Sequence, residues 1–426
     1  MKSPSKRSRV NYDAGDRDRL SALPDCLLHE IMSYLKARQV VQTNVLSKRW
    51  THLWRSVPCL DVDHDEFAVA DEDVGRRNNS YNNARERWNK FEEFTDNLLI
   101  RHDIGIARLD RFGLHVTAGL ARARLASDRW MRHAIKYSPR ASSLSPWRVK
   151  KLHLSNVRLD GCFADHVRSG CPYLEDLEMK RCRCQIHAIV SDSLKNLTLE
   201  GCVLNGLSAL TAPKLKSLVV DGCKMYEPPL LVTAPAVAYL SLATSVNKRL
   251  RRVSFEAMPS LATASICLRH NSIQTQVHKD QIKLLTSVSS VTTLELSGFK
   301  KMVLPSVPLI YMSFPEFKNL RALTLNSCDL SDDFQMLGRF LQGSPSLEKL
   351  TLRRCKLPNH PERDMRWDSS RKTSLFKRQK TSSSMCRSVI DLYCENLSLP
   401  EIIYEDEDLS ILVKDLSSIF WEPTKL

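Results

Sequence analysis

Cysteine and histidine side chains gather between positions 162 and 187, and both residue types are common zinc ligands. Structural zinc sites usually leave about two to four residues between paired cysteines. Cys182 and Cys184 are separated by a single residue, and Cys182 also fits the repeat described below. We therefore expect no metal and no cofactor from this group, which comprises Cys162, His166, Cys171, Cys182, Cys184 and His187.

Catalytic motifs are equally sparse. The chain contains no phosphate-binding loop, no Gly-x-Ser-x-Gly elbow and no His-Glu-x-x-His motif. Glycine supplies only 13 of the 426 residues, which disfavours a glycine-rich nucleotide cradle. Nothing in the sequence therefore points to a catalytic site.

Composition limits where such a protein acts. No run approaches the ~18 apolar residues of a membrane span, so we expect no membrane partner. The opening MKSPSKRSRV has no apolar stretch that would serve as a secretory signal, which favours the nucleus and/or the cytoplasm. Thiols stay reduced in those compartments, so the 13 cysteines predict no disulfide framework.

The charge balance raises the question of nucleic acid. Lys and Arg total 63 against 48 Asp and Glu, a net charge of +15. Much of the excess lies in two segments of low hydrophobicity, residues 1–18 and 358–385, which we expect to be disordered. Aromatic residues are not interleaved with these basic runs, so a base-stacking surface has little support. An import signal and plain solvated linker charge explain the runs equally well.

The segment from Leu23 to Trp54 carries more apolar side chains than one short helical unit can bury. Pro24 suits the first position of a helix, and Asp25 suits the helix dipole. A helix that is apolar on two sides must be covered on both. The first helix has two such sides. One has Leu23, Leu27, Ile31 and Leu35 at four-residue spacing, and the other has Leu28 and Met32 and is widened by Tyr34.

Two more helices are expected in the same segment. They cover about 38–46 and 48–56, and Ser47 is a candidate N-cap between them. One side of the first helix can be covered by Val41, Val45, Trp50, Leu53 and Trp54. The other side is left for a partner or for the rest of the chain.

The residues of this segment resemble an F-box, the docking module of ubiquitin-ligase substrate receptors. The resemblance rests on the Leu23-Pro24 opening and on the close Val45-Leu46-Ser47-Lys48-Arg49-Trp50, followed by Leu53-Trp54. The close is typical of plant members with leucine-rich repeats. The alternative without a docking function is an ordinary helical cap at the start of a repeat domain.

The repeats are visible in the sequence as Leu-x-x-Leu-x-Leu-x-x-Cys. Copies begin at positions 149, 174, 194, 215, 237, 261, 291, 320 and 347, which are 20 to 30 residues apart. The two residues of Leu-x-Leu point to one side of a strand, the interior of the coil. A small buried cysteine suits the turn that follows, where we place Cys182, Cys202, Cys223, Cys328 and Cys355. Irregular early copies occur at 57–62 and 109–114.

The predicted fold is α/β, and it resembles the plant F-box proteins with a leucine-rich-repeat solenoid. Parallel strands are expected on the concave face, with helices or irregular turns on the convex face. The predicted ranges are a basic tail at 1–18, an F-box at 19–56, the solenoid at 57–357, a disordered basic, serine-rich loop at 358–385 and a terminal repeat or cap at 386–426. Within the solenoid, 65–90 is expected to be a polar loop, and 91–101 and 125–137 helices.

The resemblance implies a substrate-recognition subunit of an SCF-type (Skp–cullin–F-box) E3 ubiquitin ligase. The F-box would bind the Skp adaptor and, through it, the cullin-RING ligase, while the repeats bind an unknown target protein. The resemblance carries adaptor contacts over to Leu23, Pro24, Leu27, Leu28, Ile31, Leu35, Val45, Leu46, Lys48 and Trp50. Trp54 and Leu53 are assigned instead to internal packing or to the join with the first repeat.

Target binding is expected at the strand positions that point away from the interior. These are His153, Glu178, Thr198, Val219, Ser241, Glu295, Thr324 and Thr351. Two alternatives remain open at this point. One is a repeat scaffold that acts outside a ligase, and the other is a basic protein associated with nucleic acid.

Overall fold

The computed structural model describes residues 20, 22–68, 80–102, 109–117, 125–127, 129–131, 148–226, 228–245, 253–269, 275–299, 314–330 and 335–356. The chain divides into two compact units, Met1–Pro139 and Arg140–Leu426. The tail predicted at 1–18, the loop at 358–385 and the cap at 386–426 lie outside the described residues. The predicted domain boundaries therefore stay predictions.

The first unit begins with a helical module, residues 22–56. It consists of α1 (Asp25–Met32), α2 (Ala37–Gln42), the 3₁₀ turn η1 (Thr43–Val45), α3 (Trp50–Leu53) and the 3₁₀ turn η2 (Trp54–Ser56). The three predicted helices are therefore present, and Pro24 lies one position before the first of them. The predicted N-cap at Ser47 is wrong, because α3 begins only at Trp50 and the Ser47 hydroxyl has no partner among the described residues.

Two parallel strands follow in the same unit. β1 (Cys59–Asp63) pairs with β2 (Arg111–His115), so that Leu60 lies opposite Phe112 and Val62 opposite Leu114. All four of these side chains are buried. The two irregular early repeats predicted from the sequence are therefore confirmed as strands.

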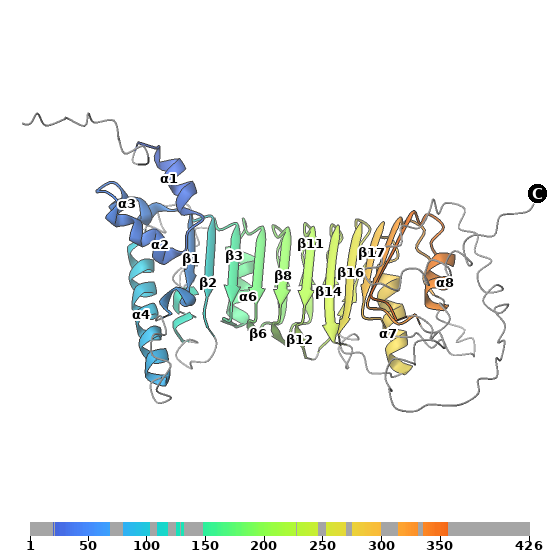
Figure 1. The fold of residues 1–426 in the computed structure, drawn as a ribbon. Coiled ribbons are helices and arrows are strands. Elements are labelled where there is room, and N and C mark those ends of the chain that lie inside the picture. The colour runs from blue at the N-terminus through green and yellow to red at the C-terminus, as the bar shows by residue number, and fades with distance from the viewer. Residues whose placement is uncertain are drawn as a thin grey trace, which may run out of the picture. The chain divides into compact units, whose positions relative to one another are not determined.

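Helix α4 (Ser80–Arg101) follows the 3₁₀ turn η3 (His64–Phe67) in the described chain (Figure 1). The sequence predicted a polar loop over 65–90, which is wrong for residues 80–90. The ring of Trp88 explains the difference, since its centroid lies 5.5 Å from that of Phe91 and 5.9 Å from that of Trp130. Trp130 lies in the short helical stretch described at 129–131, within the helix predicted over 125–137; the rest of that prediction lies outside the described residues.

The second unit contains one large parallel sheet, here called the main sheet. Its strands β3 to β17 lie side by side in Figure 1. Each of the nine predicted repeats contributes one strand, which confirms the repeat pattern. In spatial order the strands are β3 (Lys151–Ser155), β5 (Asp176–Lys180), β8 (Asn196–Glu200), β11 (Ser217–Asp221), β14 (Tyr239–Ser245), β16 (Thr263–Arg269), β17 (Thr293–Ser297), β18 (Ala322–Asn326) and β19 (Lys349–Arg353).

The register of the main sheet aligns the inward residues of successive repeats. Leu152 lies opposite Leu177, and Leu177 opposite Leu197. All three side chains are fully buried. A continuous apolar core forms in this way, because each repeat covers the apolar side of its neighbour.

The return segment of each repeat depends on the length of the repeat. The repeats that begin at 149, 261 and 320 are 25, 30 and 27 residues long, and they contain α6 (Gly161–Gly170), α7 (Thr275–Ser287) and α8 (Gln335–Gln342) respectively. The repeats that begin between 174 and 237 are 20 to 24 residues long and return through short strands instead. Fewer residues leave no room for a helix of two turns or more beside the strand.

The short return strands form two small parallel sheets. One contains β4 (Arg158–Leu159), β6 (Arg183–Gln185), β9 (Val203–Asn205) and β12 (Lys224–Met225). The other contains β7 (Ala188–Val190), β10 (Ala209–Thr211), β13 (Leu230–Thr233) and β15 (Val253–Phe255). The structure thus refines the expected helices and irregular turns to strands in this part of the solenoid.

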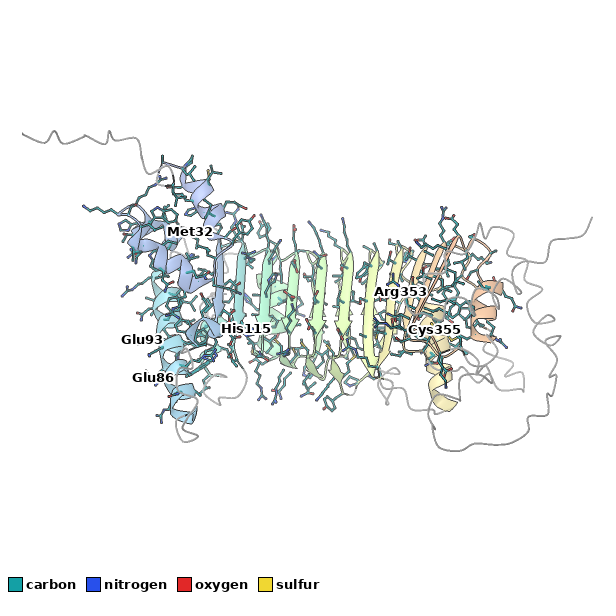
Figure 2. All side chains as sticks on the ribbon, in the orientation of Figure 1. Met32, Glu86, Glu93, His115, Arg353 and Cys355 are labelled. Atoms are coloured by element: carbon teal, nitrogen blue, oxygen red, sulfur yellow. The ribbon has the colours of Figure 1, made fainter. Side chains whose placement is uncertain are left out.

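The predicted turn cysteines form a series of buried thiols. The Cys202 thiol donates a hydrogen bond to the Met179 carbonyl oxygen, with 3.1 Å between the heavy atoms, and Cys182 donates to Leu154 over 3.3 Å. Contact with Cys202 and burial both raise the pKa of Cys182, so its thiol stays protonated. The same hydrogen bond to the preceding repeat is made by Cys223, Cys328 and Cys355. Figure 2 labels the last of these, Cys355.

Candidate adaptor-binding surface

The interior of the helical module is built from the inward side of α1 and the aromatic residues that follow. Leu28 and Met32 are one helical turn apart on α1 and are fully buried. Trp50, Leu53 and Trp54 are also buried, which confirms the internal role predicted for the last two. The second apolar side of α1 is thereby left outside this core.

That second side is exposed. The side chains of Leu27, Ile31 and Tyr34 are 49%, 41% and 81% exposed, at a spacing that places them on one helical face. Five of the twelve exposed large apolar side chains in the described residues belong to this module, and a sixth, Leu20, lies just before it. We call this set the exposed apolar surface; its members are Leu20, Leu27, Ile31, Tyr34, Val45 and Leu46.

An ion pair joins the end of the module to α1. The Arg49 guanidinium donates to the Asp25 carboxylate in the first turn of α1, with 3.1 Å from Nε to Oδ1. Val45 and Leu46 lie only a few residues before Arg49, so this contact holds their segment near the start of α1. A carboxylate in the first helical turn also favours the helix dipole.

A second ion-pair cluster joins the module to β1. The Lys36 ammonium lies 2.7 Å from an Asp61 oxygen and 3.3 Å from an Asp63 oxygen. Partial burial acts to lower the pKa of Lys36, but the hydrogen bond and the charge of Asp61 raise it above its ordinary value. Lys36 therefore stays charged and holds the α1–α2 connection against the strand.

The predicted adaptor contacts fall into three groups. Leu23 and Leu35 are half-buried. Leu28 and Trp50 are buried, and we correct their assignment, because a side chain without exposed area packs the module rather than meeting a partner. The exposed group contains Pro24, Leu27, Ile31, Val45, Leu46 and Lys48.

The sequence analysis missed two members of the exposed apolar surface. Tyr34 was assigned to the same side as Leu28, yet its spacing from Leu27 and Ile31 is that of the exposed face. The Tyr34 hydroxyl donates to the Glu30 carboxylate over 3.1 Å. Leu20 precedes the predicted helix, so no periodicity pointed to it.

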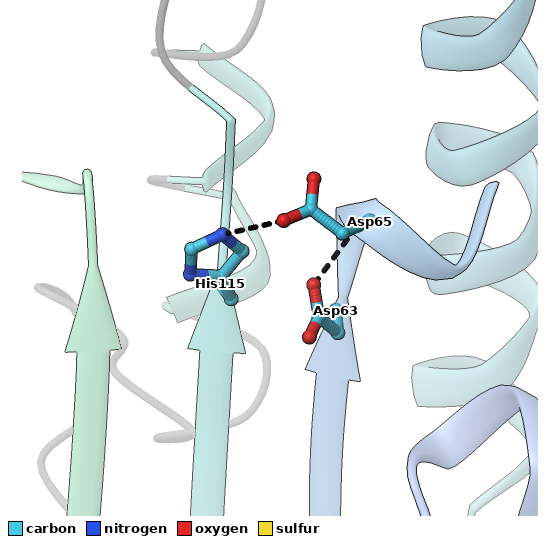
Figure 3. A group of neighbouring side chains, drawn as sticks. All are labelled: Asp63, Asp65 and His115. Atoms are coloured by element: carbon cyan, nitrogen blue, oxygen red, sulfur yellow. Dashed lines mark hydrogen bonds and ion pairs between the residues drawn. The ribbon is translucent and has the colours of Figure 1, made fainter. Parts of the chain in front are cut away.

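Among the residues that the structure describes, one group has ligand atoms close enough to hold a metal ion: Asp63, Asp65 and His115. Figure 3 shows His115 beside the Asp65 carboxylate, 3.4 Å away, and the Asp65 backbone amide on Asp63. A hydrogen bond from Thr117 lowers the pKa of Asp65, despite the opposing effect of burial. The carboxylates are thus already engaged in internal contacts, and we assign them a structural role.

The predicted target-binding residues form a single row across the main sheet. His153 lies opposite Glu178, Glu178 opposite Thr198, and the pairing continues through every strand to β19. Ser265 on β16 completes the row and was missed, although the weak repeat at 261 carries it. The prediction for Thr351 is corrected, because its side chain is only 3% exposed. The remaining predicted members are all half-buried, and all of them except Val219 are polar.

Charged members of this row already have partners on the sheet. A Glu178 carboxylate oxygen lies 2.6 Å from the Lys180 ammonium, and the other lies 3.6 Å from His153. The Ser265 hydroxyl donates to Glu295 over 3.2 Å. The row therefore offers a mildly polar surface with little unpaired charge.

Comparison with known families matches two parts of the chain. The F-box domain model matches residues 20–61, and a model described as FBD-associated F-box protein At5g56370, LRR repeats, matches residues 114–251. The first match covers the helical module with β1, and the second runs from β2 into the repeats.

Similar proteins come from plants. The chain is 30% identical over 408 residues to the MEIOTIC F-BOX protein MOF of Oryza sativa subsp. japonica, which covers 87% of this chain and 79% of the relative. It is 28% identical over 373 residues to the Putative FBD-associated F-box protein At5g50270 of Arabidopsis thaliana, covering 79% of this chain and 81% of the relative. It is 28% identical over 300 residues to the F-box/LRR-repeat protein At3g26922 of the same plant, which covers 62% of this chain and 94% of the relative.

Within the described part of the chain, every helix is too short or too polar to cross a lipid bilayer.

Proposed function

Because this chain belongs to the plant F-box proteins with leucine-rich repeats, we propose that it is the substrate-recognition subunit of an SCF-type E3 ubiquitin ligase. The helical module docks on the Skp adaptor, which bridges to the cullin-RING ligase. The observation that carries the proposal is the exposed apolar surface, where six large apolar side chains are exposed on the module or just before it, although the module has buried apolar side chains of its own.

The energetics favour a partner on this surface. Burying one leucine- or isoleucine-sized side chain contributes about 1.5–3 kcal/mol. Several such side chains can exceed the roughly 4–15 kcal/mol that association costs in lost translational and rotational freedom. Large apolar side chains exposed together on one small module typically mark an interaction site.

The proposed role involves no bond chemistry in this chain. F-box proteins are typically non-catalytic adaptor subunits, and we assign that role here. The protein would raise the effective concentration of a target lysine near the loaded conjugating enzyme. A stack of repeats suits this task because each repeat packs on its neighbours.

The target partner is proposed to bind the row on the main sheet. Its members with accessible surface are His153, Glu178, Thr198, Val219, Ser241, Ser265, Glu295 and Thr324. This face is supported by the alignment of these side chains across successive strands. We place the complex in the nucleus and/or the cytoplasm, as the composition favours.

Co-purification with the Skp adaptor tests the proposal. Leu27→Asp combined with Ile31→Asp places two charges on the exposed apolar surface without touching the buried core. We expect the adaptor to be lost from pulldowns while the thermal unfolding curve is kept. Ile100→Asp combined with Leu125→Asp is a matched control, because those side chains are 72% and 73% exposed in the same unit but outside the module.

Two results would contradict the proposal. Retention of the adaptor by the Leu27→Asp/Ile31→Asp variant would show that the surface does not dock it. Equal loss in the control variant would show that the effect is general charge rather than a specific contact. A scaffold outside a ligase is the reading that would then remain.

A further inference from the structure

One of the two small sheets of the second unit carries cations and no acid. The strands β4, β6, β9 and β12 have the sequences RL, RCQ, VLN and KM, with three cations and no acid. The strands of the second small sheet, β7, β10, β13 and β15, contain no charged residue. The main-sheet strands of the same repeats carry both signs, with Asp176, Glu178, Glu200 and Asp221 alongside Lys180.

The cations of the first small sheet form one row. Arg158 lies opposite Arg183, Arg183 opposite Val203, and Val203 opposite Lys224. Neighbouring strands are about 4.8 Å apart. Leu159, Cys184 and Leu204 point inward and are buried, so the row points outward. We call this outward side the basic face; it comprises Arg158, Arg183, Gln185, Val203, Asn205 and Lys224.

The charges of the basic face are not neutralised within the described part of the chain. Arg158 donates to the Gln185 side-chain oxygen over 2.7 Å, which leaves its positive charge unbalanced. Arg183 and Lys224 have no ion pair with any described residue. Like charges directly opposite on neighbouring strands destabilise a sheet, so the arrangement costs folding free energy. A bound anionic group would relieve that repulsion.

Next to the cations, the basic face has a second row formed by Gln185 and Asn205, whose side-chain amides can hydrogen-bond a peptide backbone. Gln185 lies opposite Asn205, and both side chains are exposed. Because the Gln185 oxygen accepts from Arg158, its amide nitrogen is left to donate. A bound peptide could place its side-chain carboxylates on the cations and its backbone carbonyl groups on the amide nitrogens of Gln185 and Asn205. One aromatic side chain, Tyr226, follows this row, which is too few for a platform that stacks bases.

We propose that the basic face is a docking site for an acidic, extended segment of a partner protein. Arg158 and Arg183 together would hold one carboxylate, and Lys224 would hold a second one further along the segment. This contact goes beyond the proposed function, because it uses neither the exposed apolar surface nor the row on the main sheet.

Binding of a fluorescein-labelled peptide of alternating glutamate and serine to the full chain tests the proposal. Arg158→Glu, Arg183→Glu and Lys224→Glu combined should weaken binding at least about tenfold, equal to roughly 1.4 kcal/mol. Lys214→Glu, Lys216→Glu and Lys283→Glu combined make the same charge change at exposed positions elsewhere and should leave the affinity within about twofold. Adaptor co-purification should be unchanged in both, which separates this test from that of the proposed function.

Three outcomes would overturn the proposal. Equal weakening of peptide binding in both triple variants would mean that binding depends on the net charge of the protein and not on the basic face. Tighter binding of an oligothymidylate than of the acidic peptide, lost in the first variant, would mean a nucleic-acid surface. Peptide binding that arises only after Glu405→Ser, Asp406→Ser, Glu407→Ser and Asp408→Ser would mean that the chain's own acidic run occupies the face.

Discussion

Leu27 and Leu28 are neighbours in α1 with opposite environments: Leu27 is 49% exposed, whereas Leu28 is fully buried. Successive residues on a helix point about 100° apart, so one turn presents an inner and an outer leucine. The inner one packs with Met32 in the core of the helical module. The outer one belongs to the surface that we propose docks the Skp adaptor. Function and stability are thus separable at adjacent positions.

Alanine substitutions at these two leucines should therefore have different effects. Leu28→Ala should lower the free energy of unfolding by about 2–5 kcal/mol, because it leaves a cavity in the core. Leu27→Ala should change that quantity by no more than about 0.5 kcal/mol, yet weaken adaptor binding about tenfold. Chemical denaturation and adaptor titration measure the two effects. Equal destabilisation by both substitutions would refute this division.

His64 should make the first unit sensitive to acid. The side chain is 5% exposed, packs edge-on against Phe91 at 4.9 Å between centroids, and neither ring nitrogen has a described hydrogen-bond partner. Burial, helped by the positive charge of Arg87, lowers the pKa of His64 from 6.5 to about 4. Between these pH values the unfolded chain takes up a proton at this residue and the folded chain does not, so stability falls as the pH drops through that window.

The loss attributable to His64 should reach up to about 3 kcal/mol by pH 4. Denaturation midpoints of the full chain between pH 7 and pH 4 measure it. In His64→Phe the ring stays apolar and uncharged, so the pH slope in this window should be shallower. An unchanged slope would assign the acid sensitivity to other groups.

Backbone conformation at the turns gives a pair of opposite effects. Arg181 and Gly201 occupy equivalent turns after β5 and β8, with φ of 53° and 61°. Glycine adopts this left-handed region without steric cost, whereas other residues pay about 1 kcal/mol. Arg181→Gly should therefore stabilise the second unit by about 0.5–1 kcal/mol, and Gly201→Ala should destabilise it by a similar amount. Thermal unfolding would contradict the argument if both shifts had the same sign.

Thiol reactivity should follow the repeat structure. Cys26 and Cys162 are exposed, whereas Cys182, Cys202 and Cys223 are buried. N-ethylmaleimide should label the exposed pair in the native protein within minutes and the buried set only after denaturation, as read by peptide mass spectrometry. Early labelling of the buried set would show that the repeats open locally.

Much of this architecture follows from local sequence. A Leu-x-Leu pair defines an inward side of a strand because side chains alternate, and every predicted repeat from 149 to 347 has such a strand. The turn cysteines follow from the same spacing. The helical module was identified because its Leu-Pro opening and its Leu-Ser-Lys-Arg-Trp close sit at a fixed distance.

Other features depended on contacts between distant residues. Trp88 extends α4 through a polar stretch that has no helical periodicity of its own, because it packs in an aromatic cluster with Trp130. The return segments of the short repeats are strands rather than helices. This depends on the length of the repeat and on pairing with the return strands of neighbouring repeats.

The sequence by itself determined the parts of this protein: a helical docking module, a series of strands, and the side of each strand that is buried. Only the tertiary structure decided which apolar side of α1 faces solvent. Both sides are apolar, so periodicity alone does not say which of them is buried. The choice is made by Trp50, Leu53 and Trp54, which come from later in the chain and pack with the module's core, leaving Leu27 and Ile31 outside.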